Sequence, residues 1–315
     1  MAQKAEFTLP SSDGTHQLHA VCWQPDQGAP RAVVQLVHGI SEHIGRYDAF
    51  AVYLADHGFA VVGHDHLGHG RTARDRKEYG FFAEREGWDL LVRDVRALRE
   101  RAGAQFPGLP HFLVGHSMGS FVARTYLIAY PGTVDGCLLL GTGQPASALL
   151  VFGQAVSGVL CRLKGPRHVS RLVTALSLGA YNRQFRPNRT SADWISSDPE
   201  AVDAYVADPL CRFLPTVGMF HDMLGGLRRI GDPSQLAHMD PATPVAFFAG
   251  ADDPVGDQGR GVEKTARLFQ EAGCRSVSVK LYPGARHELL NERIREQVYD
   301  DLLSWLEAHL AGTPG

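Results

Sequence analysis

Residues 112–126 read FLVGHSMGSFVARTY, a short apolar run followed by a glycine-flanked serine and a helical pattern. The apolar run predicts a buried strand, and the residues from Ser120 onward predict a helix. A G-x-S-x-G pattern between a strand and a helix is the setting in which a serine hydroxyl is exposed on a sharp turn. Gly115 and Gly119 remove side chains that would crowd this turn. The stretch therefore predicts Ser117 as a nucleophile, and the alternative is a structural turn whose serine caps the helix.

Similar apolar runs alternate with helical patterns along most of the chain. Predicted strands cover residues 18–23, 32–37, 59–62, 112–114, 137–140, 245–249 and 277–282. Predicted helices cover residues 46–57, 88–106, 120–130, 261–272 and 292–310. Runs such as AVVQLV (32–37) are almost continuously apolar, as in strands that are buried on both faces. The alternation predicts an α/β fold with a mostly parallel central sheet and helices on both of its faces.

The strand pattern stops between residues 142 and 239, where only helical segments and loops are predicted. A helical stretch inside an otherwise regular α/β series indicates an insertion above the sheet. We therefore expect a catalytic domain formed by residues 1–141 and 240–315, and a helical cap, or lid, formed by residues 142–239.

Composition excludes several classes of protein. The 315 residues are 44% hydrophobic and 21% charged, which is typical of a globular protein and not of a disordered chain. The 31 basic and 34 acidic residues give a net charge of −3, so we expect no nucleic-acid partner. Five scattered cysteines without a C-x-x-C pattern indicate a reducing compartment. The N-terminus lacks an apolar signal segment, and the longest apolar stretch, residues 146–163, contains polar residues, so we expect a soluble cytoplasmic protein.

A serine nucleophile needs donors for the oxyanion that forms in the reaction. The strand at residues 32–37 ends in His38-Gly39-Ile40. On this layout one N–H comes from the residue after the nucleophile and another from the loop after an earlier strand. These positions predict the N–H groups of Met118 and Ile40. His38 is interpreted as a brace for its loop, and the alternative is a catalytic base.

The base and its orienting acid should follow the serine in the order acid, then histidine, each after a later strand. Asp252 and Asp253 follow the strand at 245–249, and His287 follows the strand at 277–282. We predict His287 as the base and Asp253 as the acid, because Pro254 restricts the backbone of Asp253 to extended conformations. Asp252 remains the alternative acid. Glu288 is expected to face solvent or to brace its loop.

Five segments together resemble one family. They are HGISEHIGRY (38–47), DHLGHGRT (65–72), GHSMGS (115–120), GADDPVG (250–256) and GARHE (284–288). The set resembles the monoacylglycerol lipase/lysophospholipase branch of the α/β-hydrolase superfamily, in the right order and over nearly the whole chain. The resemblance implies an α/β-hydrolase fold with an inserted cap. It also implies Ser117 as nucleophile, Asp253 as acid, His287 as base and Ile40 as an oxyanion-hole residue.

The implied activity is hydrolysis of monoacylglycerol-like or lysophospholipid-like carboxylic esters through an acyl-enzyme intermediate, with no cofactor and no metal. The partner expected is a small acyl ester. Other acyl hydrolases on the same triad remain open, namely a thioesterase, a peptidase or a general esterase. A non-catalytic binding protein that has kept the fold is a further alternative. The sequence predicts neither the acyl chain length nor the head group nor the oligomeric state.

Two further patterns have more than one interpretation. His64, His66 and His69 lie around Asp65, but their spacing is not a standard zinc pattern, and the resemblance places the segment in a loop beside the active site. Apolar residues also recur at helical spacing within the expected cap (Leu149, Phe152, Val156, Leu160 and Leu163). They form either the packed underside of the cap or a lid helix that contacts lipid surfaces transiently.

Overall fold

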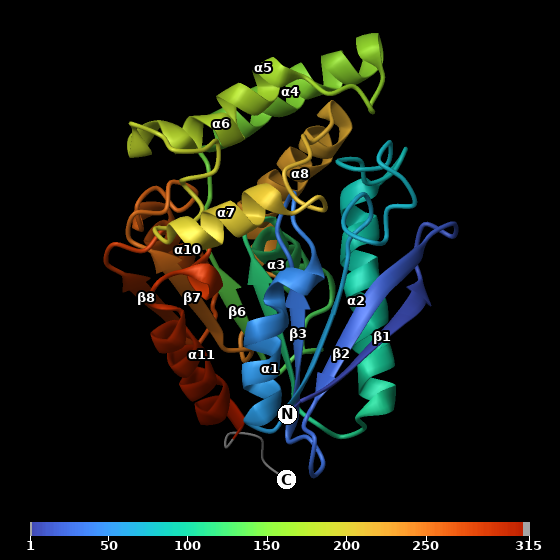
Figure 1. The fold of residues 1–315 in the computed structure, drawn as a ribbon, viewed down its shortest axis with the longest axis vertical. Helices are drawn as coiled ribbons and strands as arrows, with labels where there is room; N and C mark the ends of the chain where they lie inside the picture. The colour runs from blue at the N-terminus through green and yellow to red at the C-terminus, as the bar shows by residue number, and fades with distance from the viewer. Residues whose placement is uncertain (1, 311–315) are drawn as a thin grey trace.

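The computed structural model describes residues 2–310, and it consists of a central sheet between two layers of helices (Figure 1). Seven of the eight strands are those expected from the sequence. The strands are β1 (Gln3–Pro10), β2 (Gln17–Gln24), β3 (Ala32–Val37), β4 (Phe59–His64), β5 (His111–His116), β6 (Gly136–Leu140), β7 (Val245–Gly250) and β8 (Val277–Tyr282). The additional strand, β1, lies at the edge of the sheet and is mostly exposed.

The order of the strands is β1-β2-β4-β3-β5-β6-β7-β8. β2 pairs antiparallel with both β1 and β4, and the strands from β4 to β8 are all parallel. The expected mostly parallel sheet is therefore confirmed. Because parallel strands end at the same edge, the loops after β3, β5, β7 and β8 lie together, which is where ligands bind in such folds.

Alternate side chains of the strands enter two separate cores. In β3, Val33 and Val37 belong to one core, and Val34 and Leu36 belong to the other. Residues of α2 (Gly87–Gln105), α3 (Met118–Ala129) and α10 (Arg260–Glu271) cover the first core. Residues of α1 (Asp48–Asp56) and α11 (Arg295–Leu310) cover the second. Burial on both faces is the reason that the strand sequences are continuously apolar.

Helices α4 to α9 lie between β6 and β7, and no residue in the described region from 142 to 239 forms a strand, as expected. They are α4 (Ser147–Lys164), α5 (Arg171–Leu176), α6 (Leu178–Tyr181), α7 (Pro199–Ala207), α8 (Val217–Ile230) and α9 (Pro233–Leu236). α4, α5 and α6 lie at one end of the molecule, outward from α7 and α8 (Figure 1). α8 contributes Met219, Leu227 and Ile230 to the first core, so the insertion is packed on the sheet domain through this helix.

Helix α4 contains the apolar residues that were interpreted either as the packed underside of the cap or as a lid helix. With 18 residues and a mean hydropathy of 1.2, it is long and apolar enough to cross a membrane by length and composition alone. Its polar residues are too few to lower the mean further. Only 11% of the helix is buried, and Leu149, Phe152 and Leu163 are 63%, 67% and 77% exposed. The interpretation of these residues as the packed underside of the cap is therefore wrong.

Candidate active site

Ser117 lies at the turn between β5 and α3, with φ 54° and ψ −123°. A positive φ at a residue other than glycine costs about 1–3 kcal/mol and persists only where the surroundings impose it. The surroundings of this turn are tightly packed. A Cβ at Gly115 would lie 2.5 Å from the Gly119 carbonyl oxygen, and a Cβ at Gly119 would lie 2.0 Å from the Val37 carbonyl oxygen. The Ser117 N–H also donates to the Leu140 carbonyl at 2.9 Å. The two glycines therefore have the role expected of them.

The loop after β3 lies directly beside this turn. A Cβ at Gly39 would lie 3.0 Å from the Cβ of Ser117. Within residues 2–310, neither the Ile40 nor the Met118 N–H donates to a protein acceptor outside regular helix bonding. His38 is fully buried and braces the loop as predicted, since its Nδ1 lies 2.8 Å from the Gly39 carbonyl and its Nε2 accepts the His66 N–H at 3.0 Å. Two unpaired N–H groups beside a serine are what an oxyanion requires.

His287 and Asp253 form a buried pair beside this serine turn. His287 Nδ1 lies 2.9 Å from Asp253 Oδ2, and the two side chains are 3% and 0% exposed. The other carboxylate oxygen of Asp253 accepts the Val255 N–H at 2.9 Å. Asp252, the alternative acid, is exposed and is not the residue that contacts His287. The geometry therefore pairs the predicted base with Asp253.

A buried charge network that the sequence did not predict lies next to His287. Arg46 binds Glu288 with two bonds of 2.6 and 2.7 Å and also binds Glu42 at 3.0 Å. Glu42 in turn accepts from Tyr47 at 2.8 Å and from the Gly39 N–H, and it contacts His116 Nδ1 at 3.1 Å. Of the two interpretations of Glu288, the solvent-facing one is wrong, because this side chain is 5% exposed and joins its loop to Arg46.

The charge states in this network support one another. Burial by itself would raise the pKa of the Glu42 carboxyl, but the His116 hydrogen bond and the charges of His116 and Arg46 hold it well below its usual value. Burial would likewise lower the pKa of His116, but Glu42 raises it above its usual value. The pair is therefore ionised between the two shifted pKa values. The Glu42–His116 pair joins the loop after β3, which we call the oxyanion loop (residues 38–42), to His116, the residue before Ser117.

We expect Glu42→Gln to lower the free energy of unfolding by about 3–5 kcal/mol, because it leaves His116 buried without its anion and removes one of the two carboxylates that bind Arg46. A lowered carboxyl pKa contributes stability above the ordinary carboxyl pKa and loses it as the pH falls through the folded value. The raised pKa of His116 contributes stability below the ordinary histidine value and loses it as the pH rises through the folded value. Urea unfolding across this pH range measures both effects.

The control for this experiment is Glu307→Gln, which breaks the exposed pair with Arg31 and should change stability by less than about 1 kcal/mol. An equal loss in both variants, or an unchanged pH dependence in Glu42→Gln, would contradict the role given to the buried network.

Ser117 and His287 border a cavity of about 250 Å³ that is also lined by residues of the insertion. Its walls include Ile40 from the oxyanion loop and Trp194, Phe213 and Leu214 from the insertion. The Trp194 ring lies 4.9 Å from that of His287. The loop between α8 and α7 is also fixed to the oxyanion loop, because Ser41 Oγ donates to the Phe213 carbonyl at 2.8 Å. The cavity thus combines an apolar wall with the polar groups of the site.

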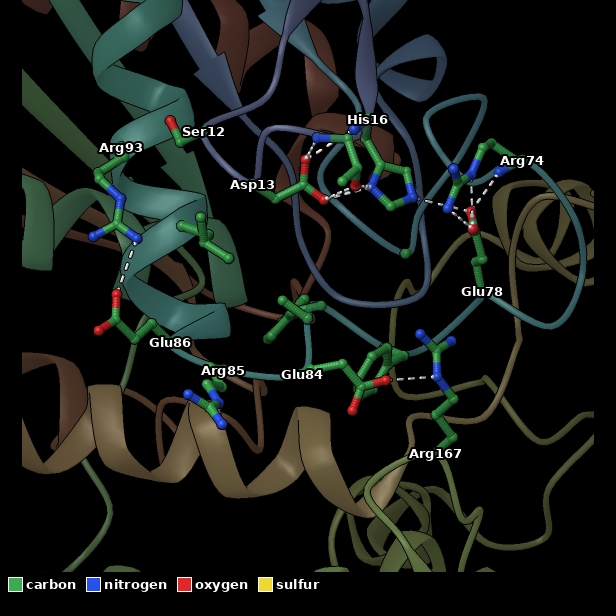
Figure 2. A pocket seen from close by; sticks show the side chains of 16 residues that line it. Ser12, Asp13, His16, Arg74, Glu78, Glu84, Arg85, Glu86, Arg93 and Arg167 are labelled. Atoms are coloured by element: carbon green, nitrogen blue, oxygen red, sulfur yellow. Dashed lines mark hydrogen bonds and ion pairs between the residues drawn. The ribbon is translucent and has the colours of Figure 1, made fainter.

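A larger cavity of about 570 Å³ lies elsewhere, next to the loop after β1 and residues 74–86 (Figure 2). Most of its charged side chains pair with one another: His16 with Asp13 and Glu78, Arg74 with Glu78, Arg93 with Glu86, and Arg167 with Glu84. Ser12 points away from His16 in Figure 2. Thr15 Oγ1 lies 3.1 Å from His16 Nδ1, but Asp13 Oδ2 contacts the same imidazole nitrogen and accepts from the Thr15 hydroxyl. His16 therefore does not lie between an acid and a hydroxyl as a triad requires, and the smaller cavity is the candidate active site.

The histidine-rich segment around Asp65 is a loop beside the oxyanion loop, as the resemblance implied. Asp65 accepts the N–H groups of Ile44 and Arg71, each at 2.8 Å, and so fixes the loop conformation. His66 packs on His38 with a centroid distance of 4.2 Å. Among the described residues, the group with metal-compatible spacing is a different one, formed by His43, Asp208 and Cys211. The expectation of no bound metal remains a prediction.

A mostly parallel sheet covered on both faces, with a serine on the turn after β5 and a later aspartate and histidine in one buried pair, defines a serine hydrolase of the α/β-hydrolase class. Comparison with known proteins agrees with this class. The chain belongs to the Hydrolase_4 family, described as serine aminopeptidase, S33, whose model matches residues 28–294.

Relatives and solved structures are similar over almost the whole chain. The chain is 32% identical to the monoacylglycerol lipase of Mycolicibacterium smegmatis, with 98% of each chain covered. It is 28% identical to the monoglyceride lipase of Homo sapiens, covering 96% of this chain and 90% of that one. A thermostable carboxyl esterase from Bacillus coagulans, solved in complex with glycerol, matches with a TM-score of 0.90 at 30% identity, covering 98% of this chain and 99% of that one. The predicted resemblance and the predicted fold are confirmed.

Proposed function

We propose that this protein hydrolyses monoacylglycerol-like carboxylic esters, with Ser117 as nucleophile, His287 as base and Asp253 as acid. The observation that carries the proposal is the serine turn beside the buried His287–Asp253 pair. His287 removes the proton from Ser117 Oγ as it attacks the ester carbonyl. Asp253 fixes the imidazole tautomer and stabilises the imidazolium. The N–H groups of Ile40 and Met118 bind the oxyanion.

The second half of the reaction uses the same groups. His287 gives its proton to the leaving alcohol, and an acyl-enzyme remains on Ser117. Water then attacks the acyl group, with His287 as base, and the free acid leaves. No cofactor or metal takes part in these steps.

The substrate class rests on two kinds of support. The relatives similar over the full length are named monoacylglycerol lipase and monoglyceride lipase, and the similar esterase was solved with glycerol. In this chain, the cavity of about 250 Å³ places apolar side chains of the insertion beside polar groups of the oxyanion loop. We propose that residues 142–239 act as a cap whose apolar wall holds the acyl chain, with the glycerol head near the loop that follows β3.

The family description makes a peptidase the second candidate. An aminopeptidase needs a free carboxylate for the substrate amine, and the two buried carboxylates that line the cavity are Glu42 and Glu288. Both are already engaged, chiefly by Arg46. This pairing favours an ester with an uncharged head over a peptide with a free amine.

The test is a substrate panel with monoacylglycerols of graded chain length, lysophospholipids, simple esters, an acyl thioester and aminoacyl anilides. The proposal expects the highest kcat/KM for a monoacylglycerol. Faster turnover of an aminoacyl anilide would assign the protein to the peptidases, and faster turnover of a lysophospholipid or a thioester would move the substrate class accordingly.

We further propose that the cap contacts lipid surfaces transiently through α4. Its exposed apolar residues include Leu149, Phe152 and Leu163, and Leu172 on α5 is 69% exposed. Three exposed basic residues, Arg162 and Lys164 at the end of α4 and Arg171 at the start of α5, supply positive charge for anionic lipid. The molecule otherwise works as a soluble enzyme in the cytoplasm, a proposal supported by five free cysteines, four of which are buried.

Replacing Leu149 and Phe152 by Ser should reduce the partition coefficient onto vesicles that contain phosphatidylglycerol by about 10²–10⁴-fold, measured by sedimentation, because it removes about 3–6 kcal/mol of apolar transfer at full insertion. Turnover of a soluble short ester should remain that of the wild type. Sedimentation of both proteins to the same extent would contradict the lipid-contact role of α4. A matched control is Val279→Ser on β8, an exposed apolar residue outside the insertion.

A further inference from the structure

Arg124 is a fully buried cation on α3, the helix that begins just after Ser117. Its two terminal nitrogens donate to neutral oxygens: Nη1 donates to the Gly143 carbonyl at 2.9 Å, and Nη2 donates to Gln144 Oε1 at 2.8 Å and to the Ile230 carbonyl at 3.2 Å, whereas the buried Nε has no hydrogen-bond partner. Burial lowers the pKa of Arg124 to about 9, so the side chain is still charged at neutral pH. Burying a cation without a carboxylate partner costs desolvation free energy, so Arg124 is expected to have a role that offsets this cost.

The acceptors of Arg124 lie at the two places where the chain crosses between sheet and insertion. Gly143 and Gln144 follow β6, just before α4 begins. Ile230 is the last residue of α8, after which the chain returns toward β7. Gln144 also donates to the Leu227 carbonyl at 3.0 Å, so the last turn of α8 is closed from both sides. Carbonyls at a helix C-terminus carry partial negative charge and favour a cation.

The outgoing crossing also packs against the base and the acid. A Cβ at Gly141 would lie 3.1 Å from the His287 ring, and a Cβ at Gly143 would lie 2.2 Å from the Val255 carbonyl. The Val255 N–H is the group that donates to Asp253. Residues 141–144 therefore pack between Arg124 on one side and the His287–Asp253 pair on the other.

We propose that Arg124 is a positioning residue that fixes both crossings of the insertion to the nucleophile helix and so sets the place of the cap over Ser117. The proposal rests on the proposed function of Ser117 and of the cap. A long acyl chain needs the cap wall in its place, whereas a short ester needs only Ser117, His287 and the oxyanion donors. Arg124 thus acts on the choice between long and short substrates rather than on the chemical step itself. The planar guanidinium of arginine can bind these three separated acceptors at once, whereas the ammonium group of a lysine is less suited to do so.

The experiment compares Arg124→Met, Arg124→Lys and Gln144→Leu with the wild type. Hydrogen exchange is measured in peptides spanning residues 140–147 and 226–233, and kcat/KM is measured for p-nitrophenyl acetate and for a long-chain monoacylglycerol. In Arg124→Met, exchange should rise at both crossings together, and the ratio of long-chain to short-chain kcat/KM should fall about tenfold. Arg124→Lys and Gln144→Leu should show smaller changes of the same kind, which keeps the test valid if Arg124→Met does not fold.

The control is Asp94→Asn, which weakens a buried contact to Ser11 and Ser12 far from the crossings. It should lower the Tm without changing the substrate ratio. An unchanged ratio in the Arg124 variants, with both rates falling alongside the Tm, would reduce Arg124 to a stability role, and increased exchange at only one crossing would also overturn the proposal. Exchange does not depend on any substrate, so it distinguishes a failure of this proposal from a failure of the proposed activity.

Discussion

Ser117→Ala should lower kcat for p-nitrophenyl esters by about 10⁶-fold, because the triad acts as a unit and no other group can form the acyl-enzyme. The fold should be unaffected, since the Ser117 backbone N–H, which donates to Leu140, is kept. Alanine must also adopt the positive φ of this turn, so a small loss of stability is expected. Steady-state hydrolysis together with thermal unfolding measures both effects.

A residual rate within about tenfold of the wild type would contradict the assignment of Ser117. The matched control is Ser120→Ala on the same helix. Ser120 Oγ donates to the Ser117 carbonyl at 2.6 Å and does not belong to the proposed triad. This variant should retain most of the activity, and it shows whether loss of a nearby hydroxyl alone disturbs the turn.

The second large effect separates the two adjacent aspartates. Asp253→Asn should lower kcat by about 10⁴-fold, because an amide in place of the buried carboxylate holds the wrong imidazole tautomer and leaves the imidazolium unpaired. Asp252→Asn should stay within about threefold of the wild type, since its side chain is exposed and does not contact His287. Parallel measurement of kcat for the two variants decides between them.

Equal losses in both aspartate variants would contradict the pairing of His287 with Asp253 alone. A larger loss in Asp252→Asn would transfer the role of acid to Asp252, the alternative that the sequence left open.

Most of the sheet could be predicted because its strands are local apolar runs bounded by turn residues. β1 was missed although Ala5, Phe7 and Leu9 alternate with polar residues, because this alternation is short and most of the strand is exposed at the sheet edge. The order of Ser117, Asp253 and His287 could be predicted since each follows a strand of the same parallel sheet. Their spatial relation then follows from the strand order, which brings β5, β7 and β8 to one edge.

The contacts that support the site depend on residues far apart in sequence. The Arg46–Glu288 pair joins positions 242 residues apart, and nothing in either local segment specifies the partner. Arg124 shows the same difficulty, because a basic residue in a helical pattern is usually assigned to the solvent face. Trp194 was missed since it lies in a turn before α7, where no periodic pattern indicates that its ring packs on His287.

The most direct test of the central claim is to label the protein with a fluorophosphonate probe and to locate the adduct by peptide mass spectrometry. The account predicts one stoichiometric adduct on Ser117, absent from Ser117→Ala and greatly slowed in Asp253→Asn. An unlabelled wild-type protein, or an adduct on another residue, would contradict the assignment of this protein as a hydrolase that acts through Ser117.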